Sequence, residues 1–202
     1  MDREYKLIIF DLGNTIIRFD HNISAAKLAK RFSLDQKKIY DLFFDSELTR
    51  AFDAGEISPK KFYQGATGVL GIDLPYSDFV SIWSDVFWED VESCNLVRRL
   101  APKYKLCLMS NVNELHFKHI KKRFNIINAF DYTVLSYLVK AMKPDKRIYE
   151  YASEISGTDF SGMLYIDDRK DLVKEASRYG IESVRFEGAK ALEDWFLKNK
   201  IL

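Results

Sequence analysis

The sequence predicts an α/β protein, with a Rossmann-like core around a parallel sheet and an inserted all-helical domain. Through most of the 202-residue chain, short apolar runs that end in polar or turn residues alternate with helical periodicity. This alternation is typical of a parallel sheet covered by helices on both faces. Between about residues 18 and 89 only helical patterns are found. We therefore expect a core domain of residues 1–17 and 90–202 and a helical domain of residues 18–89.

Five short runs are predicted to form the strands of the sheet. Each is mainly apolar, and the last has the weakest pattern: residues 7–10, 105–109, 132–135, 163–166 and 182–186. Apolar residues at spacings of three and four predict helices between them, over residues 91–100, 115–124, 147–155 and 172–179. Gly180 follows the last of these helices, where a C-cap glycine is expected.

The inserted segment is predicted to contain several helices. Five stretches have amphipathic patterns, near residues 24–32, 36–44, 47–54, 59–66 and 77–87. Gly55, Ser58 and Pro59 predict a tight turn between the third and fourth, because glycine suits a C-cap, serine an N-cap and proline the first helical position. Trp83 and Trp88 are interpreted as packing residues near the end of the segment.

The composition is that of an ordinary globular protein. Lys and Arg number 31 and Asp and Glu 30, so the net charge of +1 favours neither nucleic acid nor a membrane surface as a partner. No apolar run approaches the roughly 18 residues of a membrane span. Cys94 and Cys107 lack metal-site spacing and are expected to be reduced core thiols, which favours a cytoplasmic location. A monomer or weak homodimer is expected.

Polar residues follow the predicted strands at the edge where open parallel sheets bind ligands. In chain order these residues are Asp11 after the first strand, Ser110 and Asn111 after the second, Lys143 beyond the third, and Asp167 and Asp168 after the fourth. Carboxylate oxygens are suitable ligands for Mg²⁺, and a carboxylate can also attack phosphorus. Hydroxyl and ammonium groups can bind phosphoryl oxygens. The set therefore indicates phosphoryl transfer.

In four ordered motifs the sequence resembles the haloacid dehalogenase (HAD) superfamily. The motifs are Asp11-Leu12-Gly13-Asn14-Thr15, Ser110-Asn111, Lys143-Pro144, and Asp167-Asp168 with Asp171 just beyond. The helical insertion is similar to that family's cap domain, and residues 52–58 to the turn of the cap that faces the substrate. The first motif is most similar to a subgroup that includes small sugar-phosphate phosphatases.

The resemblance implies a magnesium-dependent phosphatase that acts on a small phosphate ester, with sugar phosphates as the first candidates. Asp11 would be the nucleophile that forms an aspartyl-phosphate, with Lys143 and Ser110 assisting catalysis. The implied ligands of Mg²⁺ are Asp11, Asp167, Asp168 and the backbone carbonyl group of Gly13. The implied phosphate-binding residues are Ser110, Asn111, Lys143 and Asn14, and Thr15 would support the loop.

One position departs from the family pattern. Most HAD phosphatases have a second aspartate two residues after the nucleophile, which protonates the leaving alkoxide, whereas this sequence has Gly13. Such general acid catalysis contributes about 10²–10⁴-fold to the rate. A glycine is explained if the loop requires a positive φ angle. Without this aspartate the enzyme would be slow, would prefer good leaving groups, or would recruit an acid from the cap, where Asp53 and Glu56 are the candidates.

Gly13 also leaves two other functions open. A haloacid dehalogenase-type hydrolase needs no general acid, because a halide leaves without a proton. The acidic pair Asp167-Asp168 nevertheless favours a metal-dependent phosphatase. The second is a catalytically weak or non-catalytic regulator, which would keep the fold of the family but hydrolyse its substrate slowly or not at all.

Two further interpretations concern the cap and the histidines. The chain crosses between the two predicted domains near residues 16–20 and 88–92, and these crossings are expected to be the hinges of a moving cap. His21, His116 and His119 have no further ligand of matching type in the sequence and are interpreted as surface residues.

Overall fold

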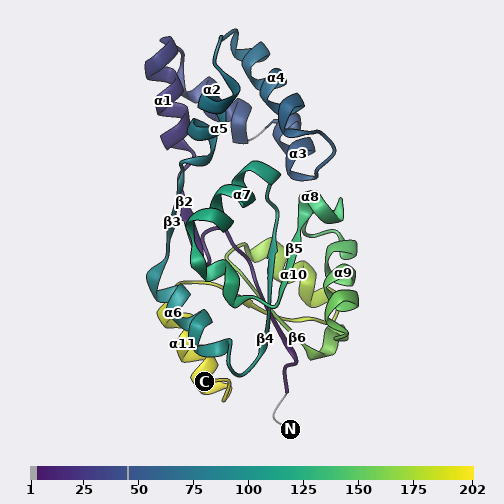
Figure 1. Cartoon of the computed structure of the whole chain (residues 1–202). Helices are drawn as coiled ribbons and strands as arrows, with labels where there is room; N and C mark the ends of the chain where they lie inside the picture. The colour runs from purple at the N-terminus through teal and green to yellow at the C-terminus, as the bar shows by residue number, and fades with distance from the viewer. Residues whose placement is uncertain (1–3, 45) are drawn as a thin grey trace.

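The chain forms an α/β core with a bundle of helices stacked on one end of it (Figure 1). This is a computed structural model, and it describes residues 4–44 and 46–202. The core sheet is parallel, with strand order β5-β4-β1-β6-β7. Its strands are β1 (Leu7–Phe10), β4 (Lys105–Ser110), β5 (Tyr132–Leu135), β6 (Met163–Asp167) and β7 (Glu182–Arg185). The predicted fold class and all five predicted strands are confirmed.

The central strand β1 is apolar throughout because helices cover both faces of the sheet. Ile8 and Phe10 contribute to the cluster on one face, and Leu7 and Ile9 to the cluster on the other, as the period of two in a strand requires. The first face is covered by α6 (Val91–Leu100), α7 (Glu114–Arg123) and α11 (Ala189–Lys198). The second is covered by α9 (Lys146–Ser156) and α10 (Lys170–Arg178). Of these helices, α11 was not predicted.

Short helical turns connect the remaining core segments. The four-residue helix α8 (Ser136–Val139) follows β5 directly, and a loop leads from it to α9. Two 3₁₀ turns, Asn125–Ala129 and Phe160–Gly162, precede β5 and β6. Cys94 and Cys107 are buried and unpaired, as predicted.

Five helices above the sheet form a second unit with its own apolar core, and we call them the cap. They are α1 (Asn22–Phe32), α2 (Gln36–Phe44), α3 (Glu47–Asp53), α4 (Pro59–Leu70) and α5 (Tyr76–Ser84). Phe43, Phe62 and Trp83 are among the fully buried residues of this core. The predicted turn is present: Ser58 accepts a hydrogen bond from the backbone N–H of Lys61, and Gly55 has φ +69°.

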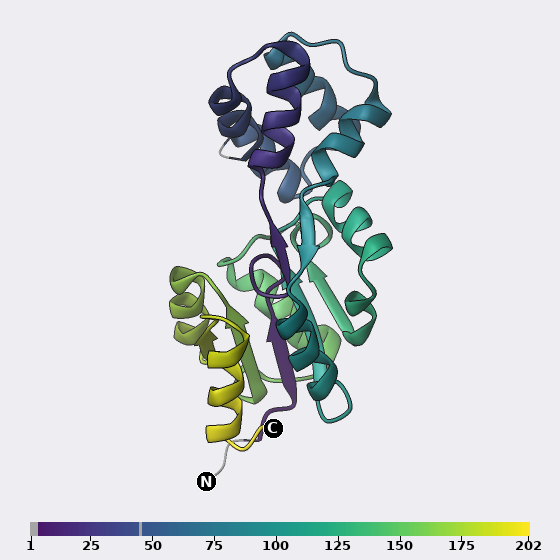
Figure 2. The ribbon, with the colours of Figure 1, turned by 90° about the vertical axis from the view of Figure 1, so that its left-hand side faces the viewer.

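The expectation that residues 18–89 are entirely helical was wrong. Strands β2 (Ile17–Phe19) and β3 (Phe87–Glu89) pair antiparallel, with Phe19 opposite Phe87, and form a two-stranded ribbon between core and cap (Figure 2). Arg18 anchors the ribbon to the start of α6 through an ion pair of 2.8 Å with Asp90. The ribbon crosses the first predicted domain boundary and ends at the second, and both boundaries stay predictions.

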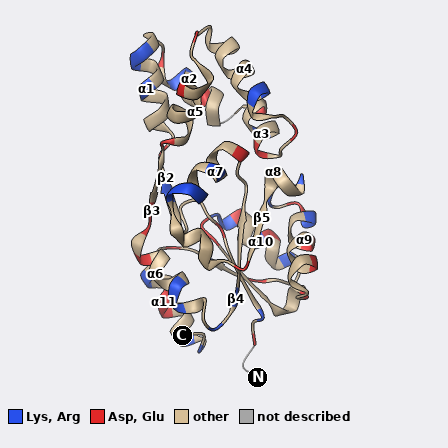
Figure 3. Ribbon diagram, in the orientation of Figure 1, with Lys and Arg blue, Asp and Glu red and all other residues tan. Residues whose placement is uncertain are grey.

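Charged residues are distributed over the outer surfaces of the helices. Figure 3 shows acidic and basic residues interspersed over both the cap and the core, in keeping with the net charge of +1. Among residues 4–44 and 46–202, no helix has the length and apolar character needed to cross a membrane.

Candidate active site

The carboxyl ends of two adjacent strands bring the predicted acidic residues together. Asp11 follows β1, and its backbone N–H donates to the carbonyl oxygen of Ile166 in β6 at 2.8 Å. Asp167 ends β6, and Asp168 follows it. Each of these three aspartates offers an oxygen, and the three oxygens lie within 4.8 Å of one another. Their convergence follows from the central position of β1, with β6 as its neighbour.

Lys143 lies between two of these carboxylates. Its Nζ donates to Asp11 Oδ1 at 2.5 Å and to Asp167 Oδ2 at 2.7 Å, and the Lys143 side chain is almost fully buried. Burial alone would lower the pKa of Lys143, but the two carboxylates raise it above its ordinary value. The ammonium group is therefore charged at neutral pH.

Asn111 holds the loop that carries Lys143. Its Oδ1 accepts from the backbone N–H of Lys143 at 2.7 Å, and its Nδ2 donates to the Lys143 carbonyl oxygen at 3.0 Å. Both the oxygen and the nitrogen of the Asn111 side-chain amide thus bind the backbone of Lys143. This geometry favours a positioning role for Asn111, and its contact with phosphate stays a prediction.

The aspartates carry more negative charge than Lys143 can neutralise. Burial raises the pKa of Asp11 to about 7, with Lys143 acting in the opposite direction and Asp167 adding to the rise. Burial and the neighbouring Asp167 also raise the pKa of Asp168. A buried group of like charges is stabilised by an additional cation. Asp171, by contrast, is exposed and pairs with Arg169 at 2.5 Å.

Two partners of Asp167 were not identified from the sequence. The hydroxyl of Tyr165 donates to Asp167 Oδ2, and the backbone N–H of Arg169 donates to Oδ1 at 2.9 Å. Tyr165 is fully buried and lies two residues before Asp167 in the same strand. The period of two in a strand puts these two side chains on the same face, so this pattern could have identified Tyr165.

The expectation that Gly13 is needed for a positive φ angle was wrong. The positive φ angle, 54°, belongs to Asn14, a residue type that tolerates it, whereas Gly13 is outside that region. A Cβ atom on Gly13 would instead lie 2.8 Å from Cε1 of Phe19. Space, rather than backbone conformation, therefore explains the glycine.

The other predicted phosphate-binding groups lie around this loop and the end of β4. Ser110 is buried, and within the described residues its hydroxyl has no hydrogen-bonding partner. Asn14 is partly exposed. Thr15 is fully buried, and no partner for its hydroxyl is found among the described residues.

The turn after α3 is docked on the core. Asp53 Oδ1 accepts from Asn113 Nδ2 at 2.9 Å, and the Asp53 carbonyl oxygen accepts from the hydroxyl of Ser136 at 2.6 Å. The Gly55 carbonyl accepts a hydrogen bond from Lys140. Burial raises the pKa of Asp53 to about 6, although the hydrogen bond from Asn113 acts to lower it. Glu56, the other candidate acid, is exposed.

The prediction that the three histidines lie at the surface was wrong for His116. That ring is buried, with Nε2 3.0 Å from the Trp83 carbonyl oxygen and Nδ1 3.2 Å from Asn113 Nδ2. It stacks on Trp83 with ring centroids 4.6 Å apart. His21 and His119 are partly buried. The spacing along α7 could not reveal this, because the ring is covered by α5 of the cap.

The two predicted packing residues Trp83 and Trp88 differ in their exposure to solvent. Trp83 is buried in the cap core, as predicted, whereas Trp88 on β3 is 47% exposed.

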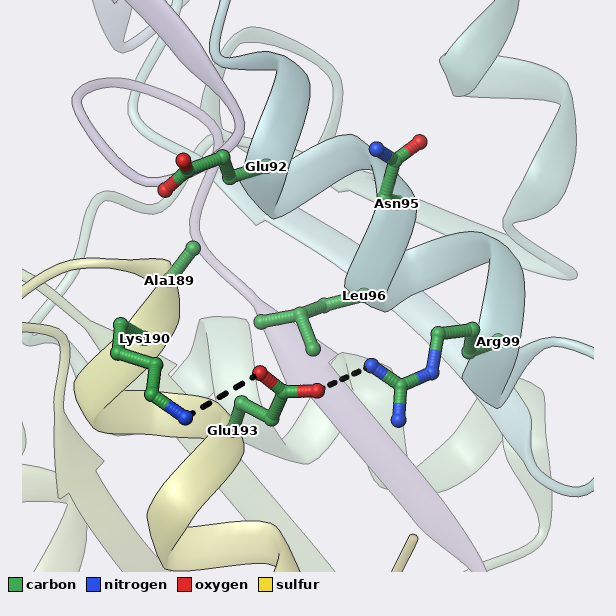
Figure 4. Close-up of a pocket in the computed structure, with 7 residues that line it drawn as sticks. All are labelled: Glu92, Asn95, Leu96, Arg99, Ala189, Lys190 and Glu193. Atoms are coloured by element: carbon green, nitrogen blue, oxygen red, sulfur yellow. Dashed lines mark hydrogen bonds and ion pairs between the residues drawn. The ribbon is translucent and has the colours of Figure 1, made fainter.

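A separate cavity of about 400 Å³ lies between α6 and α11 (Figure 4). Arg99 pairs with Glu193 inside it, and Lys190 pairs with the same carboxylate at 3.8 Å. None of the predicted site residues lines this cavity.

Comparisons with known proteins show which family this chain resembles. A hydrolase family model, described as haloacid dehalogenase-like hydrolase, matches residues 5–176. The chain is 23% identical over 199 residues to D-ribitol-5-phosphate phosphatase of Bacteroides thetaiotaomicron, covering 94% of each protein. It superposes with a TM-score of 0.81 on a HAD family enzyme of that organism, solved with magnesium and inorganic phosphate; identity is 25%, over 90% of this chain and 93% of the other.

A more distant solved structure has the same fold. L-2-haloacid dehalogenase of Xanthobacter autotrophicus matches with a TM-score of 0.67 and 16% identity, over 98% of this chain and 84% of that one.

Proposed function

The chain belongs to the haloacid dehalogenase-like hydrolase family, and from this we propose that it is a magnesium-dependent phosphatase of a small phosphorylated metabolite, with Asp11 as nucleophile. The observation that carries the proposal is the cluster of Asp11, Asp167 and Asp168 beside the buried Lys143. The similarity to a D-ribitol-5-phosphate phosphatase supports a polyol or sugar phosphate as substrate.

The donor set fits Mg²⁺. The metal takes oxygen ligands, and the three carboxylates leave excess negative charge that a divalent cation would offset. No donor among the described residues reaches the Gly13 carbonyl oxygen, which leaves it available as a ligand. Asp167 already accepts hydrogen bonds at both oxygens, so its contribution to the metal would be the smallest. Bound Mg²⁺ would neutralise phosphoryl oxygens and orient the group for attack.

Two displacements at phosphorus would complete the reaction. In the first, a carboxylate oxygen of Asp11 bonds to phosphorus while the bond to the ester oxygen breaks, and the leaving alkoxide takes up a proton. In the second, water attacks the aspartyl-phosphate, releasing inorganic phosphate and restoring Asp11. Lys143 and the hydroxyl of Ser110 would bind phosphoryl oxygens and offset the charge that collects on them.

The proton for the alkoxide needs a source other than residue 13. Asp53 is the stronger of the two cap candidates, because its pKa of about 6 keeps part of it protonated near neutral pH. Its carboxylate also accepts a hydrogen bond from Asn113, which is three residues beyond Ser110 of the proposed site. Glu56 is exposed, and its carboxylate has no hydrogen bond to the core among the residues that the structure describes.

The test is a screen of phosphorylated metabolites with Mg²⁺, repeated with the Asp11→Asn protein and with EDTA. Both changes should abolish turnover, because one removes the nucleophile and the other the metal. The matched control is Asp171→Asn, which removes an exposed carboxylate outside the cluster and should keep the wild-type rate. Phosphatase activity that persists in Asp11→Asn would refute the assignment of the nucleophile.

The second candidate function is that of a dehalogenase-type hydrolase. Gly13 supports it, because Gly13 stands where the general acid of a phosphatase usually is and dehalogenation needs no general acid. Halide release from a 2-haloacid that continues in EDTA, with no phosphate release from any ester, would establish that alternative. A protein that binds phosphate esters without turning them over would instead be a regulator.

A further inference from the structure

Phe19 fills the space where a side chain at position 13 would stand. A Cβ atom built on Gly13 would lie 2.8 Å from Cε1, 3.5 Å from Cδ1 and 3.7 Å from Cζ of the Phe19 ring. The backbone of Gly13 is not in the positive-φ region, so its conformation would accept other residues. The ring is therefore what excludes a side chain at position 13.

Several neighbours keep the ring in this position. Phe19 is paired with Phe87 across the ribbon, and their ring centroids are 6.1 Å apart. The ring of His21 lies 4.7 Å from that of Phe19, and His21 itself stacks on Phe44 of the cap at 3.6 Å. A ring supported on two sides loses contacts if it rotates away, so it cannot move freely to admit a larger residue at position 13.

Position 13 lies near Asp11 along the chain. Gly13 is two residues beyond Asp11, and two residues span at most about 7 Å of chain. Phe19 is partly exposed, so some of its surface is accessible. The Phe19 ring thus fills the space at position 13, two residues from the proposed nucleophile, where the side chain of a second aspartate would be too large to fit.

We infer that Phe19 is a specificity-determining residue: its ring takes the space beside Asp11 that a side chain at position 13 would need, and the organic group of the phosphate ester packs against it. The inference rests on the proposed function. An aromatic face favours leaving groups that present C–H or ring surface next to the ester oxygen, such as polyols, sugars or aryl groups. It disfavours a charged group there, which would be desolvated without a partner.

The first experiment compares two activated substrates that need no general acid, p-nitrophenyl phosphate and acetyl phosphate. The aryl ester offers a ring to pack on Phe19, and the acetyl ester offers almost none. Phe19→Ala should lower the ratio of kcat/KM for the aryl ester to that for the acetyl ester by about tenfold, mainly through KM. Phe19→Leu should give an intermediate ratio. Trp88→Ala, which removes an exposed ring from β3, should leave the ratio unchanged.

The second experiment is a double-mutant cycle between positions 13 and 19. Gly13→Ala should lower Tm in the wild-type background and have little effect in the Phe19→Ala background, where the ring is gone. In that background, Gly13→Asp should increase turnover of an alkyl phosphate, and with Phe19 present it should not.

The outcomes separate the inference from the function on which it rests. If the wild type hydrolyses neither activated ester, the proposed function fails. If it hydrolyses both, but Phe19→Ala keeps the wild-type ratio, the inference alone is overturned. Equal effects of Gly13→Ala on Tm with and without Phe19 would also overturn it.

Discussion

Among the individual residues, Asp53 is the one whose surroundings best suit a proton donor. Asp53→Asn should lower kcat/KM for an alkyl phosphate by about 10²-fold and have little effect with p-nitrophenyl phosphate, whose leaving group needs no proton. Because burial raises the pKa of Asp53 to about 6, the acid form is lost as pH rises, and the alkyl rate should fall above that pH.

Glu56→Gln is the control for this prediction, since Glu56 belongs to the same turn but is exposed. It should preserve both rates and the pH profile. Equal losses on alkyl and aryl substrates in Asp53→Asn would mean that Asp53 acts in docking the cap and not as an acid.

The residues of the proposed site were predictable where strand ends determine their position. Asp11 follows β1 and Lys143 lies beyond β5, whereas β4 and β6 end at Ser110 and Asp167, and apolar runs already indicated all four strands. Phe19 was not predictable in the same way, because its contact with Gly13 depends on the path of a loop. The burial of His116 depends on packing between segments far apart in sequence, and no local pattern records that.

The contact between α3 and α8 depends on Gly55. Its φ is +69°, and a Cβ atom there would lie 2.2 Å from the Tyr137 carbonyl oxygen. Gly55→Ala should therefore destabilise this contact by about 1–3 kcal/mol. In this variant we expect faster amide hydrogen exchange in residues 136–140 and a higher KM for the phosphate ester.

Gly68→Ala is the matched control, because Gly68 lies within α4 and nothing stands within 4 Å of its Cβ position. That substitution should raise stability slightly, by about 0.5–1 kcal/mol, since alanine favours helix. Unchanged exchange at α8 in Gly55→Ala would contradict the docking contact.

The packing of α5 against α7 should depend on pH through His116. Burial, His21 and His119 lower the pKa of His116 well below 6.5, and the hydrogen bond to the Trp83 carbonyl opposes this only in part. The unfolded chain therefore takes up a proton below about pH 6.5 that the folded protein does not, and stability is lost as pH falls from there. One such proton changes the free energy of unfolding by at most about 1.4 kcal/mol per pH unit.

Urea unfolding at pH 5 to 7.5 measures this dependence. His116→Gln keeps a donor for the Trp83 carbonyl and an acceptor for Asn113, and it should reduce the slope of stability against pH. His119→Gln, at a less buried position, should reduce it less. An identical slope in wild type and His116→Gln would exclude His116 as the source.

Among the helices and strands, those that are long enough to show a regular apolar pattern could be predicted from the sequence. The buried strands and the regularly patterned helices were predicted because each carries its own signal. The ribbon was missed because β2 and β3 have three residues each and pair across about 70 residues of chain. Strands this short have too few residues for an alternating pattern.

For the whole molecule, we expect the cap to open and close about the ribbon of β2 and β3. Opening must break the contacts of Asp53 with Asn113 and Ser136 and that of Gly55 with Lys140. Closing excludes water while the acyl phosphate forms. Dyes on cysteines introduced at Val69 of α4 and Leu197 of α11, both exposed, would report the distance between cap and core.

The distance distribution should narrow when Mg²⁺ and vanadate are added. The native Cys94 and Cys107 are buried and should not take the dye in the folded protein. A single distance that does not respond to these ligands would show that the cap is fixed.

The central place of β1 also determines the order of events during synthesis on the ribosome. Leu7–Phe10 is made first, yet its neighbours β4 and β6 are made about 100 and 150 residues later. The five cap helices lie wholly within that interval, and so do the buried residues of their apolar core apart from Leu115 of α7, so the cap can begin to fold before the sheet exists. Until β4 and β6 are made, β1 is an unpaired and fully apolar strand, and we expect this segment to be the one that a chaperone would protect.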